Sequence, residues 1–286
     1  MSPVLRSPPG IAPSFPGNTD TRSNVRCYKM MMLFAQTAFI GIDPTAGKRP
    51  LTYAALDSEL RLLSLAQGNL DEVLAFVAGQ RQAVVGVCSP RRPSMGVMER
   101  PEVRAQLTPP PRPGRWMKVR MVEYQLRRRR ISTYQTPDTE QKCPRWIQMG
   151  FMLYRRLEGL GFKPYPAGES QQQYLEVYPH ASYTVLLGQA PFLKNSLEGR
   201  IQRQLILYER GINLPDPMRF FEEITRHRLL KGILPDEHLC TAGELDALVA
   251  AYTAWMAVTS PEKVSLLGHE EEGLVVLPAP DLKAQY

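Results

Sequence analysis

The chain has 286 residues, of which 43% are hydrophobic and 22% charged, so it can form one large domain or two small ones with a sizeable core. It has no apolar run of the roughly 18 residues that a membrane helix needs, so we expect no membrane span. Its four cysteines have no zinc-ligand spacing and are sparse for a disulfide scaffold, so we expect neither a zinc site nor disulfides, and a reducing cytoplasmic location. The net charge of +7 favours a polyanionic partner such as nucleic acid, although a solvated basic surface explains it equally well.

The first 35 residues are rich in Pro, Ser, Arg and Gly and lack the apolar core of a secretory signal. They predict a disordered N-terminal tail, or an overlong start upstream of Met30, Met31 or Met32. We expect residues 36–286 to form the folded domain.

The first half of that domain predicts a sheet. Residues 37–43 form an apolar strand that ends in a carboxylate, and Leu51–Leu56 with residues 60–65 form a hairpin. Asn69 caps a helix, and residues 83–87 form a short central strand. A helical crossover between strands implies that parallel pairing enters an otherwise antiparallel sheet.

The second half alternates basic loops with helices. The expected elements are a Pro- and Arg-rich loop or insertion over 89–115, a basic helix over 119–130, a helix over 146–160, a strand over 174–178, a helix from Asp216 through 230, a helix opened by a Thr241 capping box and ending near 258, and a turn and strand over 268–278.

Three acidic residues stand where their surroundings favour a buried site. Asp43 comes where an apolar strand ends, and Glu176 lies inside an apolar strand, where a charge is costly unless it is paired or bound to metal. Asp246 lies in the first turns of a helix whose small neighbours allow close approach to a sheet. Each acid also has a simpler explanation. Asp43 could form a turn before Pro44, and Glu176 could lie on the exposed face of an edge strand. Asp246 could interact favourably with the helix dipole.

Two other patterns are weaker. Five residues separate Gly41 from Gly47 where a Walker loop has four, and Arg49 stands in place of Ser or Thr, so we reject a phosphate loop. The histidines have no metal-ligand spacing. His180 follows the strand over 174–178 and is predicted either to line a site there or to have a structural or surface role.

The order of these segments resembles an uncharacterised family of predicted RNase H-like nucleases, over about residues 37–280. The segments that carry the resemblance are Phe39-Ile40-Gly41-Ile42-Asp43, Cys88-Ser89-Pro90, Leu175-Glu176-Val177-Tyr178-Pro179-His180-Ala181, residues 244–254 and residues 271–278. The resemblance implies an α/β fold of the ribonuclease H-like type, with a mixed five-stranded sheet flanked by helices and with helical and loop insertions.

The resemblance also implies a cluster of acids at one edge of the sheet, which carries over to Asp43, Asp246 and Glu176 as catalytic residues and ligands of Mg²⁺ or Mn²⁺. These ions prefer hard oxygen ligands, and two-metal hydrolysis places them roughly 3.5–4 Å apart. Where the family has an aspartate after the fourth strand, this chain has Cys88. A thiol with a pKa of about 8.5 is mostly protonated and a poor magnesium ligand, so we expect the three acids to hold only one ion well.

These observations predict a metal-dependent nuclease or phosphodiesterase acting on nucleic acid. The residues predicted to contact phosphates are Arg91, Arg92, Arg127, Arg128, Arg129 and Arg130. One alternative is a non-catalytic nucleic-acid-binding or scaffold protein of the same fold with a degraded metal site, which Cys88 favours. Another is an actin- or sugar-kinase-like phosphotransferase, which the single domain and the lack of a second phosphate loop disfavour.

Overall fold

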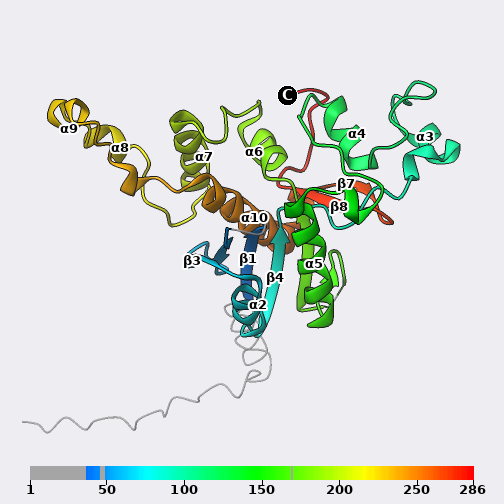
Figure 1. Ribbon diagram of the computed structural model, residues 1–286, viewed down its shortest axis with the longest axis horizontal. Helices are drawn as coiled ribbons and strands as arrows, with labels where there is room; N and C mark the ends of the chain where they lie inside the picture. Colours follow the sequence, from blue (N-terminus) through cyan, green and yellow to red (C-terminus); the bar gives the residue numbers. More distant parts are fainter. Residues whose placement is uncertain (1–36, 46–48, 169) are drawn as a thin grey trace, which may run out of the picture. The chain divides into compact units, whose positions relative to one another are not determined.

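The computed structural model describes residues 37–45, 49–168 and 170–286, drawn in colour in Figure 1. These residues belong to one compact unit. The tail predicted for residues 1–35 lies outside the described residues.

An eight-stranded mixed sheet forms the centre of this unit. Its strands are β1 (Thr37–Asp43), β2 (Leu51–Leu56), β3 (Leu62–Gly68), β4 (Gln82–Val87), β5 (Lys163–Pro164), β6 (Gln172–Val177), β7 (Ser265–His269) and β8 (Gly273–Leu277). The order is β3-β2-β1-β4-β6-β8-β7, with β5 paired to β6. Pairing is antiparallel across β3-β2-β1 and between β8 and β7, and parallel across β1-β4-β6-β8.

The helices connect and flank these strands. The α-helices are α2 (Leu70–Ala78), α3 (Pro101–Gln106), α4 (Met121–Arg128), α5 (Arg145–Gly159), α6 (Pro179–Leu187), α7 (Leu197–Glu209), α8 (Arg219–Glu222), α9 (Arg226–Leu230) and α10 (Ala242–Thr259), and the 3₁₀ turns are η1 (Val97–Glu99), η2 (Glu140–Lys142), η3 (Asp236–His238) and η4 (Pro261–Lys263).

Helix α10 packs directly on the sheet, and Figure 1 shows it in brown across β1 and β4. A Cβ built on Gly41 would lie 1.8 Å from the Ala247 carbonyl oxygen, and one on Gly86 would lie 2.6 Å from the Ala250 oxygen. The absence of side chains at these two glycines therefore allows the helix backbone to rest on the strands. The opposite face of the sheet packs against α2 and α5 through a second apolar cluster that includes Ile40.

Most of the expected elements are present. Asn69 and Thr241 cap α2 and α10 as predicted, because each side chain accepts a backbone N–H that the first turn leaves unpaired. The structure shows a capping box at both, where the sequence predicted one at Thr241. The hairpin, the central strand and the basic helix also form.

The sheet and two connections differ from the sequence-based expectation. The sheet holds eight strands where five were expected, because β5 and the β7-β8 hairpin extend it. The loop expected over 89–115 contains η1 and α3. The helix expected from Asp216 through 230 is two short helices, since Thr225 is extended and caps α9 through the Arg228 N–H.

Within the described ranges, no helix combines the length and the apolar character that crossing a lipid bilayer requires.

Candidate active site

Asp43 and Asp246 meet at the ends of the central strands. Side chains alternate between the faces of a sheet, and the register pairs Gly41 with Gly86 on the α10 face. Asp43 and Cys88 lie two residues beyond these glycines and point to the same face. A Cβ built on Gly243, in the first turn of α10, would lie 3.5 Å from Asp43 Oδ2, so this carboxylate lies beside the helix that carries Asp246.

Both carboxylates line a pocket of about 360 Å³. The residues around it are Asp43, Pro44, Cys88, Tyr134, Trp146, Tyr178, Pro179, His180, Lys194, Arg203 and Asp246. The structure therefore brings together four of the residues that the sequence predicted, from β1, from the end of β4, from the start of α6 and from α10.

The two acids share one nearby ammonium group. Lys194 Nζ forms an ion pair with Asp246, whose side chain is 9% exposed. Burial and, less strongly, the charge of the neighbouring Asp246 raise the pKa of Asp43 to about 7, against the opposing effect of Lys194. Burial also raises the pKa of Asp246, against the effect of Lys194. Arg203 also lowers the pKa of Asp246. Because both carboxyls still have raised pKa values, Lys194 and Arg203 offset the cost of their charges only in part, and this favours binding of a further cation.

Cys88 is part of this site as a thiol. Its Sγ donates to the Asp246 carbonyl oxygen over 3.4 Å, and the residue is buried. Burial raises its pKa well above the usual value, and Asp43 and Asp246 raise it further. A neutral thiol at physiological pH agrees with the expectation that Cys88 is a poor ligand for Mg²⁺.

The part of the pocket lining that comes from α7 is cationic. Arg203 is only 2% exposed, and its Nη1 donates to the carbonyl oxygens of Phe192 and Gly199. His180 is the second residue of α6, and burial lowers its pKa, with Arg203 acting in the same direction. Its imidazole is therefore neutral over most of the physiological range.

Glu176 does not join Asp43 and Asp246. The register pairs it with Val87 and Val275, which places it on the α5 face of the sheet, opposite α10. There its two oxygens accept hydrogen bonds from Arg120 at 2.7 and 2.8 Å, and Arg91 N–H donates to it at 2.9 Å. The pairing of Glu176 with a buried arginine explains a charge inside an apolar strand without a metal.

The arginines expected to contact phosphates lie outside the pocket lining. Arg91 stacks on Tyr174, and Arg92 donates to the Glu271 carbonyl. Arg127 contacts Thr133 and the Trp116 ring. The rest of the basic run, at the end of α4, is exposed at Arg128 and Arg130 and half-buried at Arg129.

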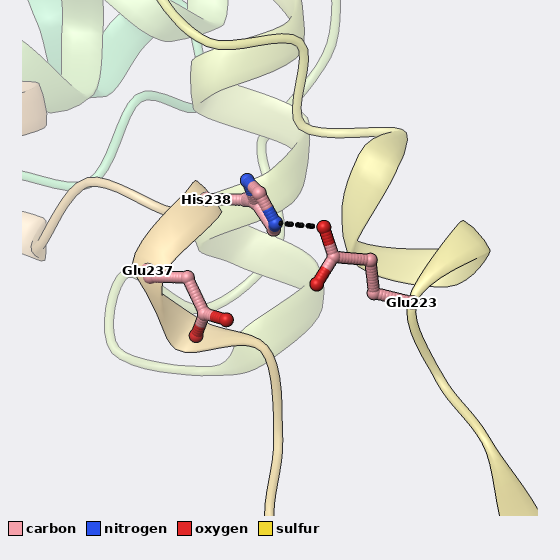
Figure 2. A group of neighbouring side chains, drawn as sticks. All are labelled: Glu223, Glu237 and His238. Atoms are coloured by element: carbon pink, nitrogen blue, oxygen red, sulfur yellow. Dashed lines mark hydrogen bonds and ion pairs between the residues drawn. The ribbon is translucent and has the colours of Figure 1, made fainter.

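A second cluster of possible ligands lies away from this pocket. In the part of the chain that the structure describes, Glu223, Glu237 and His238 are the only such group whose ligand atoms lie within 4.8 Å of one another, and Figure 2 shows them. His238 Nε2 lies 2.7 Å from Glu223 Oε1. Arg228 Nη1 lies 3.3 Å from Glu223 and 3.7 Å from Glu237, so a guanidinium already balances these carboxylates.

Sequence reasoning missed the residues that complete the pocket, which are Tyr134, Trp146, Tyr178, Lys194 and Arg203. Most of them come from loops or element ends, where no periodic pattern marks the side-chain direction. Arg203 alone had a usable signal, because it lies between Gly199 and Leu207 in an i, i+4 row on the buried face of α7.

The chain was compared with known families and proteins. Residues 41–272 match the family described as "Protein of unknown function (DUF429)", and the matched range contains the whole pocket lining described above. No curated protein and no solved structure matches the chain significantly. Because the match covers most of its length, the chain belongs to the DUF429 family.

Proposed function

We propose that this protein is a divalent-metal-dependent nuclease or phosphodiesterase of the ribonuclease H-like type. The strand order β3-β2-β1-β4-β6 supports the fold proposal, because an antiparallel β1-β2-β3 unit followed by parallel strands on the other side of β1 is the arrangement that this fold implies. The hairpin β7-β8 and strand β5 are then additions to that arrangement.

One observation carries the proposed activity: two carboxylates whose charges repel one another, Asp43 and Asp246, line one pocket. Each has a raised pKa for which burial is the main cause, and Lys194 is the only cation ion-paired with either of them within the described ranges. A divalent cation would remove this repulsion.

The donor set fits one hard cation. Magnesium is commonly held by one or two carboxylates together with waters and substrate phosphates, and Asp43 and Asp246 would supply the carboxylates. The thiol of Cys88 would stay outside the ligand set because it is protonated and donates to the α10 backbone. When bound, the cation would polarise a phosphoryl oxygen and lower the pKa of a bound water.

The remaining pocket residues would act on the phosphate. Lys194 and Arg203 provide positive charge in the pocket that holds the carboxylates, and the first residues of α6, Pro179 and His180, line the same pocket. Arg203 is held in position by two backbone carbonyls, so it would contribute charge without losing much conformational freedom.

We expect purified protein to cleave nucleic acid when Mn²⁺ or Mg²⁺ is added, and Asp43→Asn to lose about a hundredfold or more of that activity. The assay is the initial rate on labelled oligonucleotides with each metal and with EDTA. Glu271→Gln is a suitable control, because Glu271 forms an exposed ion pair with Arg100 outside the pocket. Metal-independent cleavage, or an unaffected Asp43→Asn, would contradict the proposal.

The ion pair between Lys194 and Asp246 favours a second candidate function, a non-catalytic nucleic-acid-binding or scaffold protein. In that case the lysine permanently replaces a cation, and the thermal midpoint should not change with Mn²⁺. A rise in the midpoint with Mn²⁺ in the wild type, absent in Asp43→Asn, distinguishes the metal-binding protein from the scaffold.

The raised pKa of Asp43 predicts a pH-dependent stability in the absence of metal. Between its unfolded value of 3.8 and its folded value of about 7, the native state holds the proton more tightly, so stability falls as the pH rises through this window. Asn carries no charge at any pH. The midpoint of Asp43→Asn should therefore be close to that of the wild type near pH 4, and higher above pH 7, as measured by thermal unfolding in EDTA. If the midpoint of Asp43→Asn exceeds that of the wild type most at low pH, the carboxyl of Asp43 does not have a raised pKa.

A further inference from the structure

Three aromatic side chains form one wall of the candidate site. Tyr134 follows α4, Trp146 lies in the first turn of α5, and Tyr178 is the N-cap of α6. The ring of Tyr134 lies edge-on to both others, with centroids 4.8 Å from Trp146 and 5.6 Å from Tyr178. All three rings are partly exposed and line the pocket that holds the carboxylates.

The wall remains partly exposed although its residues are large and apolar. Trp146 and Tyr134 pack at the margin of a small cluster formed by Cys143, Ile147 and Phe151 and are not enclosed by it. Ring surface at a pocket mouth, beside cationic groups, is how single-stranded nucleic acids are bound, because every base has a face that can stack.

The cationic residues of the same pocket suit a phosphate. Arg203 is almost completely buried, yet it lines the pocket. Its Nη1 donates to two backbone carbonyls, and its guanidinium carbon lies 5.3 Å from the centroid of the Tyr183 ring. Lys194 lines the same pocket. A buried guanidinium directed to a pocket is a strong phosphate ligand, because it presents several donors in a fixed plane.

The volume of the pocket limits the size of the ligand that it can hold. Its volume of about 360 Å³ lies at the lower end of the range of ligand pockets, about 300–1,000 Å³. Such a space accepts one nucleotide, while a base pair with both backbones would remain outside. Enzymes that act on nucleotides in such pockets use strands that are already unpaired, or take the nucleotide out of the duplex.

We infer that the pocket takes an unpaired nucleotide, with its base against Tyr134, Trp146 and Tyr178 and its phosphate toward Lys194 and Arg203. Single-stranded nucleic acid is therefore the ligand of the site. This inference rests on the proposed function, since it specifies the form of nucleic acid on which the same site acts.

Binding in the absence of cleavage tests the inference. The full chain carrying Asp43→Asn, in EDTA, is titrated by fluorescence anisotropy into labelled single-stranded DNA, single-stranded RNA, the corresponding duplexes, and a single strand with abasic sites. We expect one of the single strands to bind more tightly than its duplex, and the abasic strand to bind about tenfold more weakly than the intact strand. A duplex that binds as tightly as both single strands would overturn the inference.

Substitutions of Trp146 in the same background locate the base. Trp146→Leu keeps an apolar side chain and removes the aromatic face, so the affinity of this variant for the intact strand should fall to that for the abasic strand. Trp146→Phe should still bind the intact strand more tightly than the abasic strand. Phe221→Ala should do the same, because it removes an exposed ring on α8, outside the pocket. If Trp146→Leu still distinguishes intact from abasic strands, the base is not at this wall and the inference fails.

Cleavage assays on the wild type separate this inference from the proposed function. Selective binding of single strands without any metal-dependent cleavage would keep the inference and contradict the hydrolase. Equal cleavage of duplex and single strand would keep the hydrolase and contradict the inference.

Discussion

Glu176→Gln should destabilise the protein strongly, by about 3–5 kcal/mol, which corresponds to a fall of roughly 10 °C in the thermal midpoint. The carboxylate forms a two-bond ion pair with Arg120, which is 1% exposed. Burial alone would lower the pKa of Arg120, but Glu176 holds that pKa above its usual value, so the guanidinium stays charged. The amide would remove the ion-pair partner of this buried positive charge, and thermal unfolding measures the cost.

The matched control is Glu271→Gln, which makes the same change in an exposed pair with Arg100, where the two side chains are 40% and 47% accessible. Solvent screens such a pair, so its removal should change the midpoint little. The two variants also test whether Glu176 is a metal ligand. A Glu176→Gln protein that is only slightly destabilised, but loses its response to Mn²⁺, would support the ligand prediction and contradict the structural role.

Gly41→Ala should prevent α10 from packing on β1. The added methyl would lie 1.8 Å from the Ala247 carbonyl oxygen and 2.5 Å from the Ala251 nitrogen, which are backbone atoms that cannot rotate away. Overpacking of a core costs about 1–3 kcal/mol when side chains can adjust, and more where they cannot. We expect a midpoint lower by about 10 °C, or insoluble protein, and a weaker response to Mn²⁺, because the shift separates Asp246 from Asp43.

Gly159→Ala is the control for this substitution. Gly159 is the last residue of α5, and no atom lies within 4 Å of the position that its Cβ would occupy. Because Ala is favoured over Gly in a helix by about 1 kcal/mol, this variant should be as stable as the wild type or slightly more so. Comparable losses in both variants, measured by circular dichroism melts, would show that the close contact at Gly41 is not the cause.

The sequence determined the local structure of this protein. The Asn69 and Thr241 capping boxes mark the starts of α2 and α10, because they depend on residues three positions apart. The apolar run before Asp43 predicts the strand and places the carboxylate at its end, where β1 leaves the core. Asp246 follows in the same way from its position in the capped helix.

Only the tertiary structure decided which side chains share the site. The face to which a strand residue points depends on its register with neighbouring strands, and a difference of one residue reverses it. Asp43 therefore points to α10, while Glu176 points to the other face and to Arg120, which is 56 residues away in the chain. Lys194 and Trp146 reach the pocket from a loop and from the start of α5, because α10, α6 and α5 gather at the strand ends; no local pattern in the sequence encodes that arrangement.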